Sequence, residues 1–134
     1  MAKWRHSWGD TQSIRIGNRV NIQDNVVIHS TPKVSVTIGD NVSIDHSAIL
    51  HGCTIGNNVI IGMGSIILDN LRVDDWVLVG AGSVITSDSI IPSRSLVLGV
   101  PGNVARQLYD DEINRITNNA EELLLLKVIL IFVK

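Results

Sequence analysis

The chain has 134 residues, a formal net charge of −2 and only 18% charged residues, so no excess of Lys and Arg is present to neutralise phosphates. We therefore expect no nucleic-acid partner, and the lack of an apolar run of about 18 residues argues against a membrane span. Cys53 is the single cysteine, which excludes an internal disulfide framework and a cysteine-rich zinc site. Because residues 1–10 contain no apolar leader, we expect a cytoplasmic protein.

The composition favours thin layers of short strands. Aromatic residues make up only 4% of the chain, whereas Ile, Leu and Val are abundant. A compact globule normally fills its core with aromatic side chains, and β-branched aliphatic residues favour strands. We therefore expect many short strands around a narrow interior.

An aliphatic residue recurs every six positions along most of the chain, with a longer gap after Ile28 and one step of five between Leu50 and Ile55. The series consists of Ile16, Ile22, Ile28, Ile38, Ile44, Leu50, Ile55, Ile61, Ile67, Val73, Val79, Ile85, Ile91 and Val97. A fixed period of six is typical of a parallel β-helix and not of a β-sandwich. Each unit is a short strand and a turn, three units form one triangular coil, and coils stack about 4.8 Å apart. The predicted fold class is all-β.

A helix is predicted after the repeat, from about residue 110. Asp110, Asp111 and Glu112 place negative charge at the start of this segment, which suits the dipole at a helix N-terminus. Apolar residues then recur at helical spacing, at Ile113, Ile116, Ala120, Leu123 and Leu124. We therefore divide the chain into a β-helix domain over 1–106 and a C-terminal helical segment, 107–134, that packs back on the β-helix.

Three of the four histidines fall on the repeat in a pattern that counting can test. Ile28 and Leu50 are one coil apart, and His29 and His51 each follow one of them directly, so these histidines should stack on one face. Imidazoles whose bases lie about 4.8 Å apart can converge on one metal ion through bonds of about 2.0–2.1 Å. His46 belongs to the preceding unit, on a different face, and cannot reach the other two within the same chain.

A symmetric oligomer would bring the three histidines together. If β-helices pack side by side around a threefold axis, one subunit offers His29 and His51 and its neighbour offers His46. Three neutral imidazoles with an open fourth position are typical of a catalytic zinc site. The alternative is that all three lie on turns and bind nothing. By the same counting, Asp24 stacks beside His46 with Gln23 adjacent, as polar groups that could orient a metal ligand.

The segments that carry these residues resemble the gamma-class carbonic anhydrase-like proteins, a family of trimeric left-handed parallel β-helix proteins. The resemblance covers about residues 7–125 and rests on NIQDNVVIH, VTIGDNVSIDHSAILHGCTIGNNVIIGMGSIIL, VGAGSVI and SLVLGVPGNVAR. It implies a homotrimer in which His29 and His51 of one subunit and His46 of the next bind Zn2+, with Fe2+ or Co2+ as alternatives. It also implies that Gln23 and Asp24 lie near a metal-bound water. The implied reaction is attack of a metal-bound hydroxide on carbon dioxide, which gives bicarbonate.

The sequence departs from the family pattern at several positions. The family's Arg-Gly-Asp segment has Trp8 in place of Arg, and the register places Trp8 one coil below His29, where the Arg would pair with a carboxylate such as Asp24. Acidic residues of the founding enzymes are replaced by Thr11 and by the short segment 30–35. We therefore expect weak hydration activity. Family members usually have one or two further coils before this point, so the resemblance implies a member that is shortened at its amino end.

Two other functions remain open at this stage. A hexapeptide acyltransferase would use a single histidine as general base at a subunit interface, and residues 99–102 resemble the closing turn of that group. That function would explain His46 but not the stacking of His29 on His51. A non-catalytic metal-binding or assembly subunit would keep the fold, and the replaced Arg and acids favour it. Metal analysis and a carbon dioxide hydration assay would separate these alternatives.

Overall fold

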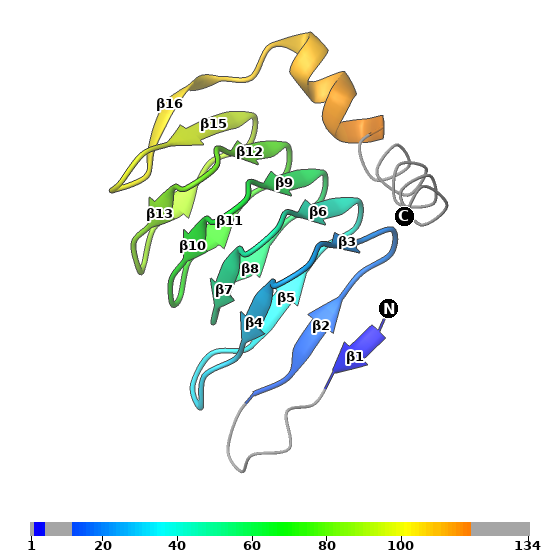
Figure 1. Ribbon diagram of the computed structural model, residues 1–134, viewed down its shortest axis with the longest axis vertical. Coiled ribbons are helices and arrows are strands. Elements are labelled where there is room, and N and C mark those ends of the chain that lie inside the picture. Colours follow the sequence, from blue (N-terminus) through cyan, green and yellow to red (C-terminus); the bar gives the residue numbers. More distant parts are fainter. Residues whose placement is uncertain (1, 5–11, 119–134) are drawn as a thin grey trace.

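The computed structural model describes residues 2–4 and 12–118, which form a parallel β-helix with one helix at its carboxyl end (Figure 1). The predicted all-β class, a parallel β-helix followed by a C-terminal helix, is confirmed. Three sheets form the three faces of the β-helix, and here they are named sheets A, B and C. Because each coil contributes one strand to each sheet, residues one coil apart in the sequence become neighbours across a strand pair.

The strands of sheet A, in spatial order, are β1 (Ala2–Trp4), β2 (Ile14–Ile16), β5 (Val36–Ile38), β8 (Thr54–Ile55), β11 (Arg72–Val73) and β14 (Ile90–Ile91). Those of sheet B are β3 (Asn21–Ile22), β6 (Val42–Ile44), β9 (Val59–Ile61), β12 (Val77–Val79), β15 (Ser95–Leu98) and β16 (Asn103–Gln107). Those of sheet C are β4 (Val27–His29), β7 (Ile49–His51), β10 (Ile66–Ile67) and β13 (Val84–Ile85). All pairs are parallel except β1 with β2 and β15 with β16.

The six-residue series lines the interior. Every member from Ile38 to Val97 is buried, whereas Ile22 and Ile28 in the first coil are partly buried. Burial of aliphatic side chains removes apolar area from water and stabilises the fold by roughly 25 cal/mol per Å². Because each coil repeats the same three strands, the period also determines which residue of one coil lies above which residue of the coil before it.

The corners between strands turn through residues with left-handed backbone. Asn41 and Asn58, each with a φ of 57°, hold this position between sheets A and B; asparagine tolerates it because its short polar side chain bonds locally. The corner between sheets C and A differs at the five-residue step. There Gly52, with a φ of 50°, directly follows His51, so this turn is one residue shorter than its counterpart at Asn70 in the next coil.

The C-terminal helix begins at residue 110, where the acidic residues predict it, and is described to residue 118. It packs on the outer face of sheet B, where Leu96, Leu108 and Ile116 form a second buried apolar cluster. Glu112 accepts hydrogen bonds from both terminal nitrogens of Arg106, at 2.8 and 2.7 Å, and from the backbone N–H of Tyr109 at 2.7 Å. These bonds fix the start of the helix to strand β16. No helix in residues 12–118 is long and apolar enough to cross a membrane.

The outer face of sheet C has a different surface. Val27, Ile49, Ile66 and Val84 occupy one outward column in matched register on β4, β7, β10 and β13. Val27 is 51% exposed and Ile49 is 36% exposed. This column of four aliphatic residues is the apolar ladder of sheet C.

Candidate metal centre

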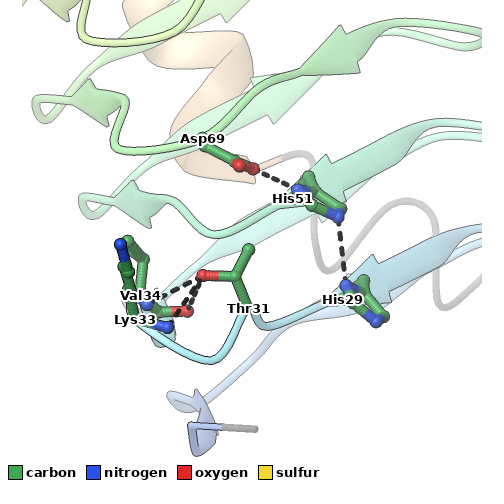
Figure 2. A network of polar contacts seen from close by, with 6 residues as sticks. All are labelled: His29, Thr31, Lys33, Val34, His51 and Asp69. Atoms are coloured by element: carbon green, nitrogen blue, oxygen red, sulfur yellow. Dashed lines mark hydrogen bonds and ion pairs between the residues drawn. The ribbon is translucent and has the colours of Figure 1, made fainter.

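Strands β4 and β7 place two histidines side by side. The strands pair in parallel with His29 opposite His51, as the counting predicts, so the predicted stacking is confirmed. The two rings are stacked with their centroids 4.8 Å apart and an angle of 13° between their planes. Nδ1 of His29 lies 3.1 Å from Nε2 of His51 (Figure 2). Their role as metal ligands stays a prediction.

The separation of these nitrogens fits two ligands of one ion. In a tetrahedral site with metal–nitrogen bonds of 2.0–2.1 Å, two ligand nitrogens lie about 3.3 Å apart. The distance of 3.1 Å between His29 Nδ1 and His51 Nε2 is close to this value. Imidazole nitrogens are suitable donors for zinc and for divalent iron or cobalt. The pair therefore has the chemistry and the spacing of half of a tetrahedral site.

Asp69 is a third member of this cluster, and it was not predicted. Its Oδ1 contacts Nδ1 of His51 from the coil above (Figure 2). A metal-binding histidine commonly donates its other ring N–H to a carboxylate in this way. The signal was present in the sequence, because Ile67 lies one coil after Leu50, and Asp69 follows Ile67 by two residues. Counting one coil further from His51 reaches Leu68, so the period places Asp69 next to that position but does not by itself predict the contact.

His46 lies elsewhere, as predicted. It follows strand β6 at the corner between sheets B and C and is exposed, whereas His29 and His51 end their strands at the corner between sheets C and A. Within the described residues of one chain, no three His, Cys, Asp or Glu side chains come close enough to hold a metal ion. One chain therefore brings together two of the three predicted ligands.

Gln23 and Asp24 lie at the same corner as His46, one coil earlier. The backbone N–H of Gln23 donates to the carbonyl of Ile44 at 2.9 Å, and the carbonyl of Asp24 accepts from the N–H of Ser47 at 3.0 Å. The predicted stacking of Asp24 beside His46 is thus present in the backbone. Gln23 is half-buried and Asp24 is exposed, and the roles of both side chains stay predictions.

Two titratable groups near the histidines have shifted pKa values. Burial raises the pKa of Asp45, and the neighbouring His46 partly opposes this shift. Burial raises the pKa of Cys53 to about 12, and the charge of Asp69 adds to this shift. Since only the thiolate is a strong nucleophile or metal ligand, Cys53 is a core residue at neutral pH and not a part of the site.

The loop over residues 30–35 is short and contains no carboxylate. The hydroxyl oxygen of Thr31 closes it by accepting from the backbone N–H groups of Lys33 at 3.2 Å and Val34 at 2.8 Å (Figure 2). Trp8 and Thr11 lie outside the described residues, so the expected weakening of hydration stays a prediction.

Comparison with known proteins places this architecture in a family. Residues 35–69 and 52–87 match the family described as "Bacterial transferase hexapeptide (six repeats)". The "Probable carbonic anhydrase" of Methanocaldococcus jannaschii is 46% identical over 112 residues, which cover 84% of this chain and 70% of that protein. "Gamma carbonic anhydrase 2, mitochondrial" of Arabidopsis thaliana is 38% identical over 119 residues. The chain spans only 43% of the length of this plant relative.

A solved structure has the same fold. The hexapeptide transferase family protein from Anaplasma phagocytophilum matches with a TM-score of 0.78 and 38% identity, over 84% of this chain and 66% of that one. Sequence and fold therefore agree along most of the β-helix. Because the similarity extends over most of the archaeal relative, the chain belongs to the gamma carbonic anhydrase-like family of hexapeptide-repeat proteins.

Proposed function

We propose that this chain is a metal-dependent carbonic anhydrase-like enzyme that converts carbon dioxide to bicarbonate as a homotrimer. The observation that carries the proposal is the pairing of His29 with His51, whose ring nitrogens lie 3.1 Å apart. His46 supplies the third imidazole from the other edge of sheet C. Relatives named carbonic anhydrase support the reaction.

The outer face of sheet C supports association through this face. The apolar ladder runs between the corner of His46 and the corner of His29 and His51. Covering Val27 and Ile49 with a second subunit would remove exposed apolar area from water. In a closed threefold arrangement, each interface would take His29 and His51 from one subunit and His46 from the next.

Three imidazoles from two subunits would hold Zn2+, or Fe2+ or Co2+ in its place, with one position open. When bound, the ion supplies the Lewis acidity that activates water near neutral pH. The half-buried amide of Gln23 would orient water or carbon dioxide by hydrogen bonding. The carboxylate of Asp24 would accept a hydrogen bond from His46 and hold its ring in place. Gln23 and Asp24 lie at the same corner as His46, between sheets B and C.

The first test measures metal content and molecular mass on freshly purified protein. We expect a trimer with about one metal ion per chain, because each interface holds one site. His29→Ala and His46→Ala should each lose the metal and the hydration of carbon dioxide. A monomer that carries a full complement of metal would refute the shared site.

Mixing the two variants tests whether the ligands come from different subunits. After exchange of subunits at equal amounts, about a quarter of the interfaces should combine intact His29 and His51 with intact His46. Metal binding and hydration should therefore recover to about that fraction. No recovery after subunit exchange has been verified would contradict the proposal.

An acyltransferase is the second candidate, because the matching family and the Anaplasma protein are both described as transferases. In that case acyl transfer from acyl-coenzyme A should depend on His46 and should be insensitive to metal removal. A non-catalytic metal-binding subunit would keep the metal and the trimer without any hydration. The cytoplasm stays a prediction, since the plant relative is named mitochondrial.

A further inference from the structure

We propose that Asp69 is a positioning residue that fixes the tautomer and the orientation of His51, so that His51 offers Nε2 as its metal-binding atom. The inference rests on the proposed function for the nature of the site. The contact between Asp69 Oδ1 and His51 Nδ1 on which it builds lies entirely within one chain.

The hydrogen-bond chemistry of this contact determines where the proton lies. An ionised carboxylate only accepts hydrogen bonds, so the proton between the two groups belongs to Nδ1 of His51. A neutral imidazole has one protonated nitrogen, and Nε2 of His51 therefore carries the lone pair. Metal ions bind the unprotonated nitrogen. Asp69 thus prepares His51 for binding through Nε2.

The same nitrogen is the one that faces His29. Because Nε2 of His51 carries a lone pair, Nδ1 of His29 donates to it across 3.1 Å in the metal-free protein, and an ion bound between the two nitrogens would replace that proton. The carboxylate, His51 and His29 then form one ordered chain of donors and acceptors across three coils. Asp69 acts through His51 and does not itself approach the position of an ion that both rings would share.

Asp69 lies beside the short corner at Gly52. A Cβ on residue 52 would lie 3.4 Å from Oδ1 of Asp69 and 3.3 Å from side-chain atoms of Thr31 and Val34. A side chain there would be tight against Thr31 and Val34 and in van der Waals contact with the carboxylate, and the φ of 50° disfavours most residues with a Cβ other than Asn and Asp. The five-residue step of the repeat thus places a residue without a side chain next to the carboxylate of Asp69.

Stability alone gives little reason for this contact. The side chains of His51 and Asp69 are 36% and 45% exposed, and ion pairs at such exposure contribute little to folding. Variants of Asp69 should therefore fold. Asp88 provides a matched control, because it is an exposed carboxylate in the following coil that accepts a hydrogen bond from Asn70 Nδ2 at 2.8 Å.

The test compares Asp69→Ala and Asp69→Asn with Asp88→Ala, using Zn2+ as the probe. Zinc affinity is measured by competition with a chromophoric chelator. The tautomer of His51 is read by nitrogen NMR on metal-free protein labelled with 15N-histidine. Thermal unfolding checks that each variant keeps the fold.

We expect His51 to carry its proton on Nδ1 in the parent and to shift towards the Nε2–H form in Asp69→Ala. Zinc affinity should fall about 10- to 100-fold in Asp69→Ala, less in Asp69→Asn, whose amide oxygen still accepts, and within about twofold in Asp88→Ala. A parent His51 protonated on Nε2, or an unchanged zinc affinity in Asp69→Ala, would overturn the inference. If Asp69→Ala does not fold, the same criteria apply to Asp69→Asn.

The outcomes separate this inference from the proposed function. If the variants bind zinc as tightly as the parent, Asp69 has no positioning role while the shared metal site stands. If the parent binds no zinc, the proposed function fails and with it the ligand role of His51, while the tautomer measurement still reports what Asp69 does to the ring.

Discussion

Sheets B and C are built by the same six-residue repeat, yet their outer faces are covered differently. On sheet B, Leu96 is buried beneath Leu108 and Ile116 of the C-terminal segment. On sheet C, the corresponding outward positions form the apolar ladder, and Val27 remains 51% exposed. Within residues 12–118 the chain covers one apolar face by itself and leaves the other exposed. The histidines lie at the two edges of the face that is left open.

The largest effect should follow from a charge on the apolar ladder. Ile49→Asp places a carboxylate between the two histidine corners, and burying it unpaired in a subunit interface costs several kcal/mol. We expect the dissociation constant of the trimer to rise by more than about 100-fold, with loss of bound metal. Sedimentation velocity measures the dissociation of the trimer, and metal analysis measures the bound metal.

Ile90→Asp is the matched control for this variant. Ile90 lies on the outer face of sheet A and is 70% exposed, so the same chemical change there should leave assembly and metal content unaltered. A trimer that survives Ile49→Asp intact would show that sheet C is not the interface.

Truncation of a side chain between the C-terminal helix and sheet B should lower the stability of the fold and leave the assembly unchanged. Ile116 is 2% exposed, and Ile116→Ala should lower the free energy of unfolding by about 2–4 kcal/mol, since it leaves a cavity between helix and sheet. Urea denaturation at fixed protein concentration gives this value. Ile113→Ala, at a partly buried position of the same cluster, should cost less. An equal loss in both variants would contradict the packing described for this face.

The smallest effect concerns the attachment of the helix and depends on pH. Hydrogen bonds from Arg106 and from the Tyr109 backbone lower the pKa of Glu112 from 4.5 to about 2. A carboxyl whose folded pKa is depressed stabilises the fold above its unfolded pKa, and this stabilisation is lost as pH falls from about 4.5 towards 2. Glu112→Gln should therefore be less stable at pH 7 and should lose less stability on acidification than the parent.

Denaturant midpoints at pH 7, 4 and 3 measure this difference. Asp111→Asn removes the same charge from an exposed neighbour and should keep the steeper pH dependence of the parent. If Glu112→Gln and the parent lose stability in parallel, the bonds to Glu112 do not contribute to folding.

The period of six could predict the core and the histidine pair because both depend only on counting. Once Ile28 and Leu50 lie one coil apart, the parallel pairing places His29 opposite His51 whatever the turns do. The start of the helix could likewise be read from local chemistry, since acidic residues suit a helix N-terminus. These features are local or strictly periodic, and so they are visible in one sequence.

The rest depends on interactions that the period does not contain. The contact of Asp69 with His51 lies beside the shortened turn at Gly52, whose step of five is visible in the sequence but whose side-chain neighbours are not. Strand β16 reverses direction after the repeat ends, and no periodic signal marks it. The proposed assembly of the site from two subunits rests on the different corners at which His46 and the pair of His29 and His51 lie.

The reversal at β16 has a consequence for how copies of this protein can associate. Strand β16 occupies the edge of β15, and Val84 of β13 exchanges backbone hydrogen bonds with Gly99 and Gly102 of the connecting loop. The third sheet ends at β14, which is only two residues long, and such short edges are poor templates for pairing. In the described part of the chain, this end therefore offers a further copy little more than the short edge of β14 on which to continue the coils. We therefore expect growth along the axis into filaments to be disfavoured there, and crowding at high concentration to favour closed lateral assemblies.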